Sequence, residues 1–180
     1  MGKISCLFGL LRLLFYKLFY GRKLKCSLIQ HIHKGIIINL KGKCHCVFGK
    51  NICTYNNCKF SAYNGAKLIV GENSYFSGNC TVTATKNITI GKNVLFGPGV
   101  IIVDFNHNYK GTDLINMQGL TSEDVLIGDN VWIGANCIIM KGSKIGEGSV
   151  IAGGTIVRGK IPPNSLVHNK KELIITEIKR

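Results

Sequence analysis

Hydrophobic residues recur every six positions in the C-terminal half of the chain. The first residue of each hexad is aliphatic and the residue four positions later is mostly small or β-branched; the aliphatic set is Ile127, Ile133, Ile139, Ile145, Ile151 and Val157. A period of six matches neither a helix nor a single strand. It is typical of a parallel β-solenoid of triangular cross-section, in which each side takes one hexad and three hexads complete one turn.

Less regular hexads precede this block and begin at Phe48, at Val70 and, after a slip of two residues, at Ile90. The repeat stops at residues 104–124, which are polar and turn-forming, and it ends at Pro162-Pro163. We therefore predict an all-β coil over residues 36–165, with a loop at 104–124 and a basic tail at 166–180. A long loop inside a compact repeat is usually functional.

The first 35 residues are expected to form a helix and a basic linker. Apolar residues recur at spacings of three and four, which predicts an amphipathic helix over residues 4–19, with the stripe Ile4, Leu7, Phe8, Leu11, Leu14, Phe15, Leu18 and Phe19. Arg12 and Lys17 lie off this stripe and disfavour a membrane span. The stripe either packs on the coil or on another subunit, or lies in an anionic membrane surface; the basic run that follows within residues 1–25 favours the membrane.

Positive charge is concentrated at the N-terminal end. Residues 1–71 hold 12 of the 23 Lys and Arg residues and none of the nine Asp and Glu residues, in a chain of net charge +14. Such a region attracts phospholipid, nucleic acid or a phosphorylated substrate, unless it is only a solvated face. The aromatic residues of the first 20 positions lie on one apolar stripe and are not spaced for base stacking, so we expect no nucleic acid.

Eight cysteines raise the question of disulfides. The N-terminal apolar stretch is interrupted by Arg12 and has no cleavage site, so we expect a cytoplasmic protein with reduced thiols, peripheral on the inner face of the cell membrane if the helix binds lipid. Cys58, Cys80 and Cys137 occupy the small inward hexad position and are expected in the core. A zinc site within residues 44–58 is the alternative, but the spacing matches no standard pattern, and we predict no metal.

Among the five histidines, only His107 stands where the regular coil breaks into the loop. An imidazole in that position, beside Asp104, Asn106 and Tyr109, is a candidate general base, because its ordinary pKa lies near working pH. Asp104 or a backbone carbonyl would fix its tautomer. A loop histidine without a function is the alternative.

Two segments carry a resemblance to a known family. Residues 127–136 read IGDNVWIGAN, and residues 88–109 read ITIGKNVLFGPGVIIVDFNHNY. Both resemble hexapeptide-repeat acyltransferases of the galactoside and maltose acetyltransferase group, and most closely the O-acetyltransferases of bacterial capsule, exopolysaccharide and lipopolysaccharide synthesis. The resemblance implies a left-handed parallel β-helix, a homotrimer, and acetyl-CoA bound in a groove between neighbouring coils.

Matched residue by residue, the resemblance makes His107 the catalytic base. It implies CoA contacts at Trp132, Gly134, Ala135, Gly153, Gly154, Arg158 and Lys160. The candidate acceptor contacts are Ser77, Asn79, Asp104, Asn106, Tyr109 and Gln118. The family often carries Asn where this chain has Ser77 and an acid where it has Thr85, so free galactoside or maltose is not the expected acceptor.

These observations predict an acetyl-CoA-dependent O-acetyltransferase that acts on a sugar hydroxyl in bacterial polysaccharide synthesis. An N-acetyltransferase on an amino sugar, which can be nucleotide-linked, needs the same base and the same groove and stays open. A scaffold that kept the coil and lost catalysis is a third possibility, and the presence of His107 argues against it.

Overall fold

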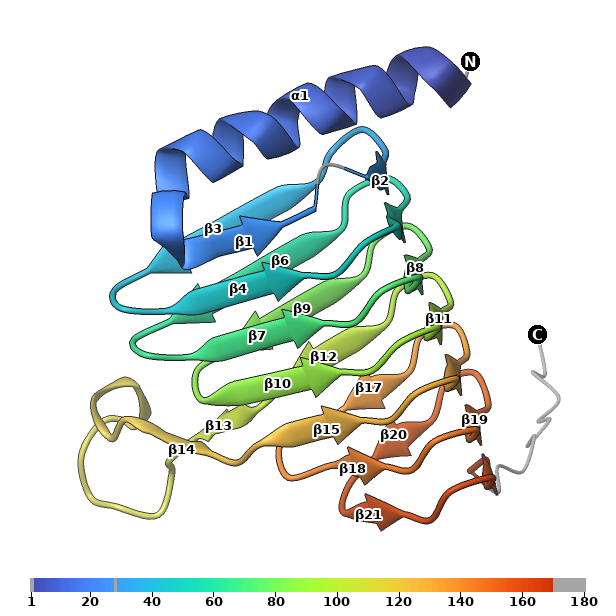
Figure 1. The fold of residues 1–180 in the computed structure, drawn as a ribbon. Coiled ribbons are helices and arrows are strands. Elements are labelled where there is room, and N and C mark those ends of the chain that lie inside the picture. Colours follow the sequence, from blue (N-terminus) through green and yellow to red (C-terminus); the bar gives the residue numbers. More distant parts are fainter. Residues whose placement is uncertain (1, 28, 170–180) are drawn as a thin grey trace, which may run out of the picture.

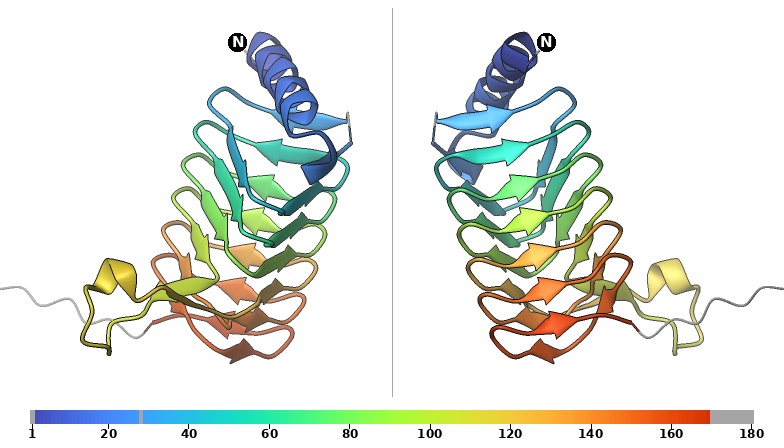
Figure 2. Two further views of the ribbon diagram at one scale, coloured as in Figure 1. Left: turned by 90° about the vertical axis from the view of Figure 1, so that its left-hand side faces the viewer. Right: turned by 90° about the vertical axis from the view of Figure 1, so that its right-hand side faces the viewer.

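The structure is a computed structural model that describes residues 2–27 and 29–169 (Figure 1). Helix α1 (Gly2–Tyr20) and a short 3-10 turn, η1 (Gly21–Lys23), precede a stack of parallel β-coils. Each complete coil contributes one strand to each of three sheets, which form the sides of a triangular prism (Figure 2). The front strands in Figure 1 run to the right and the chain returns behind them as it descends, which is a left-handed winding.

Strands from successive coils pair in parallel within each sheet. The first sheet contains β1 (Leu24–Cys26), β4 (His45–Phe48), β7 (Lys67–Val70), β10 (Asn87–Ile90), β15 (Val125–Ile127), β18 (Lys144–Ile145) and β21 (Lys160–Ile161). The second contains β2 (Gln30–Ile32), β5 (Ile52–Thr54), β8 (Tyr75–Phe76), β11 (Leu95–Phe96), β16 (Trp132–Ile133), β19 (Val150–Ile151) and β22 (Leu166–Val167). The third contains β3 (Ile37–Lys41), β6 (Lys59–Tyr63), β9 (Thr81–Ala84), β12 (Ile101–Val103), β17 (Ile138–Ile139) and β20 (Ile156–Val157).

Three corners join the sheets, and we number them in chain order. The first corner leads from the first sheet to the second, the second corner leads from the second sheet to the third, and the third corner leads back to the first sheet of the next coil. The first two corners repeatedly hold residues with positive φ, such as Asn73 (58°) and Asn136 (55°). Asparagine tolerates this left-handed conformation better than other residues with a side chain, which explains its recurrence at these turns.

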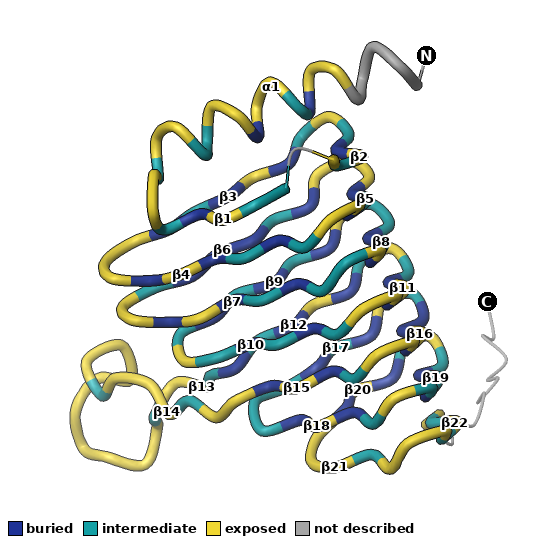
Figure 3. The backbone as a smooth tube through the Cα atoms, viewed as in Figure 1, coloured by how far each residue is buried: buried dark blue, intermediate teal, exposed yellow. Residues whose placement is uncertain are grey.

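The hexad residues form the core as predicted. Ile133, Ile139 and Ile151 are fully buried, and the small position is buried too, for example at Cys137 and Ser149. Alternation of buried and exposed residues along the coils is visible in Figure 3. The predicted all-β solenoid with a short N-terminal helix is therefore confirmed.

The N-terminal coils are wider than a six-residue period allows. Cys46 pairs with Leu68, 22 residues later, whereas Leu126 pairs with Lys144, 18 residues later. A wider coil encloses more volume, and large side chains fill it: Phe60, Phe76 and Phe96 pack in a column, with ring centroids 5.1 and 4.3 Å apart. Isoleucine and valine fill the narrower C-terminal coils. The six-residue period is therefore regular in those coils and irregular in the wider N-terminal ones.

The coil also extends beyond the predicted range of residues 36–165. It begins at Leu24, which is buried and pairs with Cys46, and it continues past the two prolines to β22, which pairs with β19. Pro162 and Pro163 turn the first corner of the last coil. In the preceding coil, the N–H of Gly146 at the same corner donates to Ile161 of the coil below. No described coil lies below the prolines, so their missing N–H groups cost no hydrogen bond in the stack.

Helix α1 lies across the N-terminal end of the stack (Figure 1). Its inner side carries Gly9, Leu13, Tyr16 and Tyr20; Leu13 is buried, and Tyr16 and Tyr20 pack against the core. The predicted apolar stripe lies on the other side and is exposed from Leu7 to Phe19. The alternative that this stripe packs on the coil is therefore wrong for these residues. Glycine at position 9 lets the opposite side of the helix approach the sheet instead. The side chain of Ile4 lies outside the described residues.

The three cysteines predicted for the core lie in it. Cys58, Cys80 and Cys137 are buried, and none of the seven cysteines from Cys26 to Cys137 forms a disulfide. Burial raises the pKa of the Cys46 thiol above its ordinary value, with smaller contributions from Cys44 and Cys26. Within residues 2–27 and 29–169, no group of three or more His, Cys, Asp or Glu side chains is placed to hold a metal ion.

Candidate active site

The loop at residues 104–124 leaves the stack at the third corner. It begins as β13 (Phe105–His107), passes through a 3-10 turn, η2 (Ile115–Met117), and returns as β14 (Leu120–Ser122). β13 and β14 pair antiparallel, with His107 opposite Leu120. His107 therefore stands on a two-stranded arm that projects from the prism (Figure 1).

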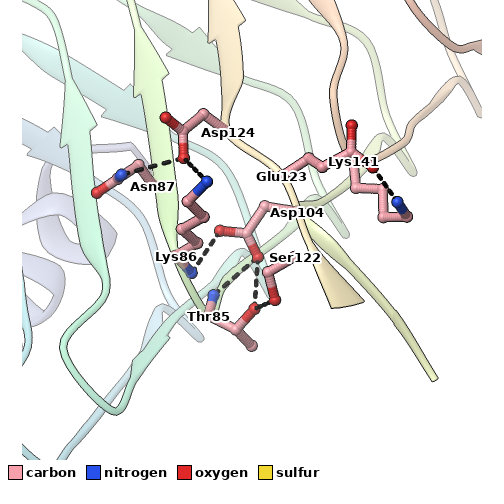
Figure 4. Close-up of polar contacts among 8 residues, drawn as sticks. All are labelled: Thr85, Lys86, Asn87, Asp104, Ser122, Glu123, Asp124 and Lys141. Carbon is pink, nitrogen blue, oxygen red and sulfur yellow. Dashed lines mark hydrogen bonds and ion pairs between the residues drawn. The ribbon is translucent and has the colours of Figure 1, made fainter. Parts of the chain in front are cut away.

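A dense set of polar contacts holds the base of this arm (Figure 4). The carboxylate of Asp104 is fully buried and accepts hydrogen bonds from the backbone N–H groups of Thr85 and Lys86, both at 2.8 Å. It also accepts the Thr85 hydroxyl at 3.0 Å, and that hydroxyl lies 2.7 Å from the hydroxyl of Ser122. The first and last residues of the arm are thus bound to the same corner of the coil above.

Three further contacts fix the returning end of the arm. Glu123 donates its backbone N–H to the carbonyl of Asp104 at 2.9 Å and pairs with Lys141 from the coil below. Asp124 forms an ion pair with Lys86 at 3.3 Å. Exposed ion pairs contribute little each, so the buried Asp104 is the main support of the loop.

Gln118 closes the tip of the arm. Its side-chain oxygen accepts the N–H of Gly111 at 2.9 Å, and its side-chain nitrogen donates to the carbonyl of Asp113 at 2.6 Å. Asn108 donates to the carbonyl of Gln118 at 2.9 Å and accepts the hydroxyl of Thr121. These bonds give the loop a defined shape without a hydrophobic core of its own.

A hollow of about 450 Å³ lies along the arm, lined by Asn106, His107, Asn108, Tyr109, Lys110, Gly111, Gln118, Thr121 and Lys141. His107 is exposed and faces it, and its ring lies 6.3 Å from that of Phe105 in an edge-to-face arrangement. A hollow of this size and a solvent-accessible imidazole allow proton transfer to or from a bound molecule.

The predicted acceptor contacts fall into two groups. Asn106, Tyr109 and Gln118 line the hollow with His107. Asp104 is occupied by Thr85 and Lys86, so it supports the arm and does not reach the histidine ring through any hydrogen bond among the described residues. Ser77 and Asn79 lie at the second corner, at the far end of the third sheet.

The predicted CoA residues are also divided between corners. Gly134, Ala135, Gly153 and Gly154 stack in two neighbouring coils at the second corner, where Gly154 donates its N–H to the carbonyl of Ala135 at 2.8 Å. A Cβ at position 134 would lie 2.6 Å from the nitrogen of Gly153, so only glycine fits. Trp132 is 54% exposed on the second sheet, and Arg158 and Lys160 flank the third corner.

Lys141 is a candidate that the sequence pattern did not single out. It lies at the third corner, in the coil directly below the loop, and lines the hollow with His107. The hexad register places residues 140–143 at this corner, so tracing the register would have brought Lys141 and the loop together. No signal in the sequence connects Thr85 with Asp104.

Similarity to known proteins agrees with this geometry. Residues 124–159 match the family model for the bacterial transferase hexapeptide, six repeats. Residues 124–159 thus carry the hexapeptide repeat that this family model describes. No curated protein sequence matches it.

Three solved structures resemble this chain. A hexapeptide-repeat acetyltransferase from Vibrio cholerae is 28% identical, with 67% of this chain and 66% of that chain covered and a TM-score of 0.55. A maltose O-acetyltransferase from Clostridium difficile is 29% identical, with 74% and 64% covered and a TM-score of 0.50. A galactoside acetyltransferase in complex with coenzyme A is 28% identical, with 74% and 60% covered and a TM-score of 0.54.

The chain spans less than two thirds of the length of each of these relatives. Their fold is similar to that of this chain, and two of them belong to the maltose and galactoside acetyltransferases that the sequence resembles. All three are named acetyltransferases, and the galactoside acetyltransferase is in complex with coenzyme A.

Proposed function

We propose that the protein transfers an acetyl group from acetyl-CoA to a hydroxyl of a saccharide, with His107 as the general base. The observation that carries this proposal is the exposed imidazole on a rigid arm beside a hollow, on a coil whose relatives are acetyltransferases. The base takes the proton of the hydroxyl as its oxygen attacks the thioester carbonyl. The C–S bond then breaks, an ester bond remains on the sugar, and the CoA thiolate takes up the proton from the imidazolium.

The second corner supplies the complementary half of the site. The N–H groups of Ala135 and Gly153 have no acceptor among the described residues, so they are free to donate to a ligand. Such donors stabilise the negative oxygen of a tetrahedral intermediate. The glycines beside them leave room for the extended arm of CoA to lie close to the backbone.

One protomer cannot bring these two halves together. The second and third corners lie at opposite ends of the third sheet, and a side of six residues spans roughly 20 Å. We therefore propose a homotrimer in which the arm of one protomer reaches the second corner of the next. Four apolar side chains of the loop would be covered by this contact, and they are 43–75% exposed in the single chain: Leu114, Ile115, Met117 and Leu120.

The acceptor is proposed to be a polymeric or lipid-linked saccharide of the bacterial surface. Free maltose or galactoside is not favoured, because the acidic residue typical of that group is Thr85 here and is bonded to Asp104. The direct assay is release of free CoA thiol from acetyl-CoA with candidate saccharides. If the acetyl group is found on an amine instead of a hydroxyl, the protein is an N-acetyltransferase and this proposal is wrong. If no saccharide causes thiol release, the remaining interpretation is a scaffold without catalytic activity.

Mixed trimers are expected to recover activity if the site is shared. We expect His107→Ala and Ala135→Trp to be inactive separately, because the first removes the base and the second fills the proposed CoA groove. Co-expression of the two variants would restore activity in the fraction of interfaces that combine the intact arm of one chain with the intact corner of the other. A mixture as inactive as its parents, although it forms mixed trimers, would contradict a shared site.

A further inference from the structure

The outer side of α1 carries large apolar side chains that are exposed at the N-terminal end of the stack; Figure 3 shows exposed positions recurring along the helix. Its exposed fractions include 64% at Phe8, 63% at Phe15 and 86% at Leu18. Leu7, Leu11, Leu14 and Phe19 complete the same stripe. Large contiguous apolar surfaces are uncommon on proteins that remain free in solution, so this one requires a partner.

The helix is fixed so that this surface points away from the prism. The hydroxyl of Tyr20 donates to the carbonyl of Ile38 at 2.9 Å, and Leu13 is buried against the first coil. A Cβ at position 9 would lie 1.8 Å from the carbonyl oxygen of Ile32, so the inner side is in close contact with β2. Rotation of the stripe toward the coil would break all three contacts.

Basic residues border the apolar surface. Arg12 and Lys17 lie on opposite sides of the stripe, between its exposed and its packed sides. Directly after the helix, a hollow of about 270 Å³ is lined by residues that include Arg22, Lys23, Lys25, His45 and Lys67. No acidic residue occurs before Glu72.

This combination selects one occupant. A second copy of the same surface would bring two groups of like charges together, which opposes association. An anionic bilayer supplies an apolar layer for the stripe and phosphate groups for its basic border. Within residues 2–27 and 29–169, no helix is long and apolar enough to cross a membrane, and a helix held flat across the end of the prism suits the interface instead.

We propose that α1 docks flat on an anionic phospholipid bilayer, so that the prism stands upright on the membrane. The arm with His107 leaves the stack three coils below β1, and successive strands lie about 4.8 Å apart. With the helix included, the hollow lies roughly 25 Å from the membrane surface. If the proposed transfer to a saccharide holds, the modified sugar lies at that height and not next to the lipid headgroup.

The test is flotation of the full chain with vesicles of phosphatidylcholine, alone or mixed with phosphatidylglycerol. We expect the protein to float with the anionic vesicles only and to be released at high salt. Leu18→Glu should lower vesicle binding about tenfold or more, because it removes a buried leucine and adds a like charge to the lipid. Leu166→Glu changes the net charge equally at a 70% exposed leucine on β22 and should bind like the wild type.

Equal flotation of Leu18→Glu and wild type would overturn the proposal, as would wild-type protein that does not float. If the wild type does not float and Leu18→Glu also dissociates the oligomer in light scattering, the surface is a contact between copies of the chain. Thiol release with a soluble saccharide should be unchanged in Leu18→Glu. A wild-type protein that binds the vesicles but releases no thiol with any saccharide would count against the proposed function and leave the membrane proposal intact.

Discussion

Replacement of His107 by alanine is expected to lower turnover about 10²–10⁴-fold, the usual contribution of a general base. The change should leave KM for acetyl-CoA nearly unaltered, since the proposed CoA contacts lie at the second corner. Stability should also be retained, because the ring is exposed on β13. The measurement is thiol release under saturating acetyl-CoA, with circular dichroism and light scattering on the same samples.

A second exposed histidine provides the control. His31 lies on β2, near α1 and far along the stack from the loop, and His31→Ala should keep wild-type turnover. His107→Gln keeps a polar side chain of similar reach and lacks the basic nitrogen, so it should be as slow as His107→Ala. Wild-type turnover in either variant of position 107 would remove this residue from the mechanism.

Replacement of Asp104 by alanine is expected to have the largest effect on stability in the site. Two backbone N–H groups, from Thr85 and Lys86, would lose their acceptor and the Thr85 hydroxyl would lose one partner. The expected cost is about 2–4 kcal/mol, or roughly 5–15 °C in melting temperature. Turnover should fall as well, because the arm that carries His107 loses its support.

Asp124→Ala is the matched change at the other end of the loop. Asp124 is half exposed and pairs with Lys86 at 3.3 Å, so its removal should cost about 0–1 kcal/mol. Equal melting temperatures for the two aspartate variants would show that the buried carboxylate does not support the arm. Thermal unfolding of both variants, monitored by circular dichroism, distinguishes these outcomes.

The C-terminal coils could be predicted because their period is fixed by geometry. A side of six residues repeats without exception from Ile127 to Val157, and each aliphatic residue is buried. The N-terminal coils take 22 residues, a number that six does not divide, so their start at Leu24 was missed. The helix was predicted correctly from its stripe. The sequence left the direction of that stripe open, because it depends on the close approach that Gly9 permits.

The candidate site was only partly accessible from the sequence. The loop and His107 follow from the interruption of the repeat, which is a local signal. The bond between Asp104 and Thr85 joins residues 19 positions apart in neighbouring coils and cannot be read from either segment alone. The division of the predicted ligand contacts between two corners likewise appears only after the coil is wound.

The two ends of the prism are closed by different means. An open coil presents strand edges that invite another molecule to add its own coil, and repetition of that step would build a fibre. At one end α1 lies over the first coil, and at the other Pro162 and Pro163 remove two donors from the corner of the last. The same features that delimit the stack should therefore keep it from polymerising end to end.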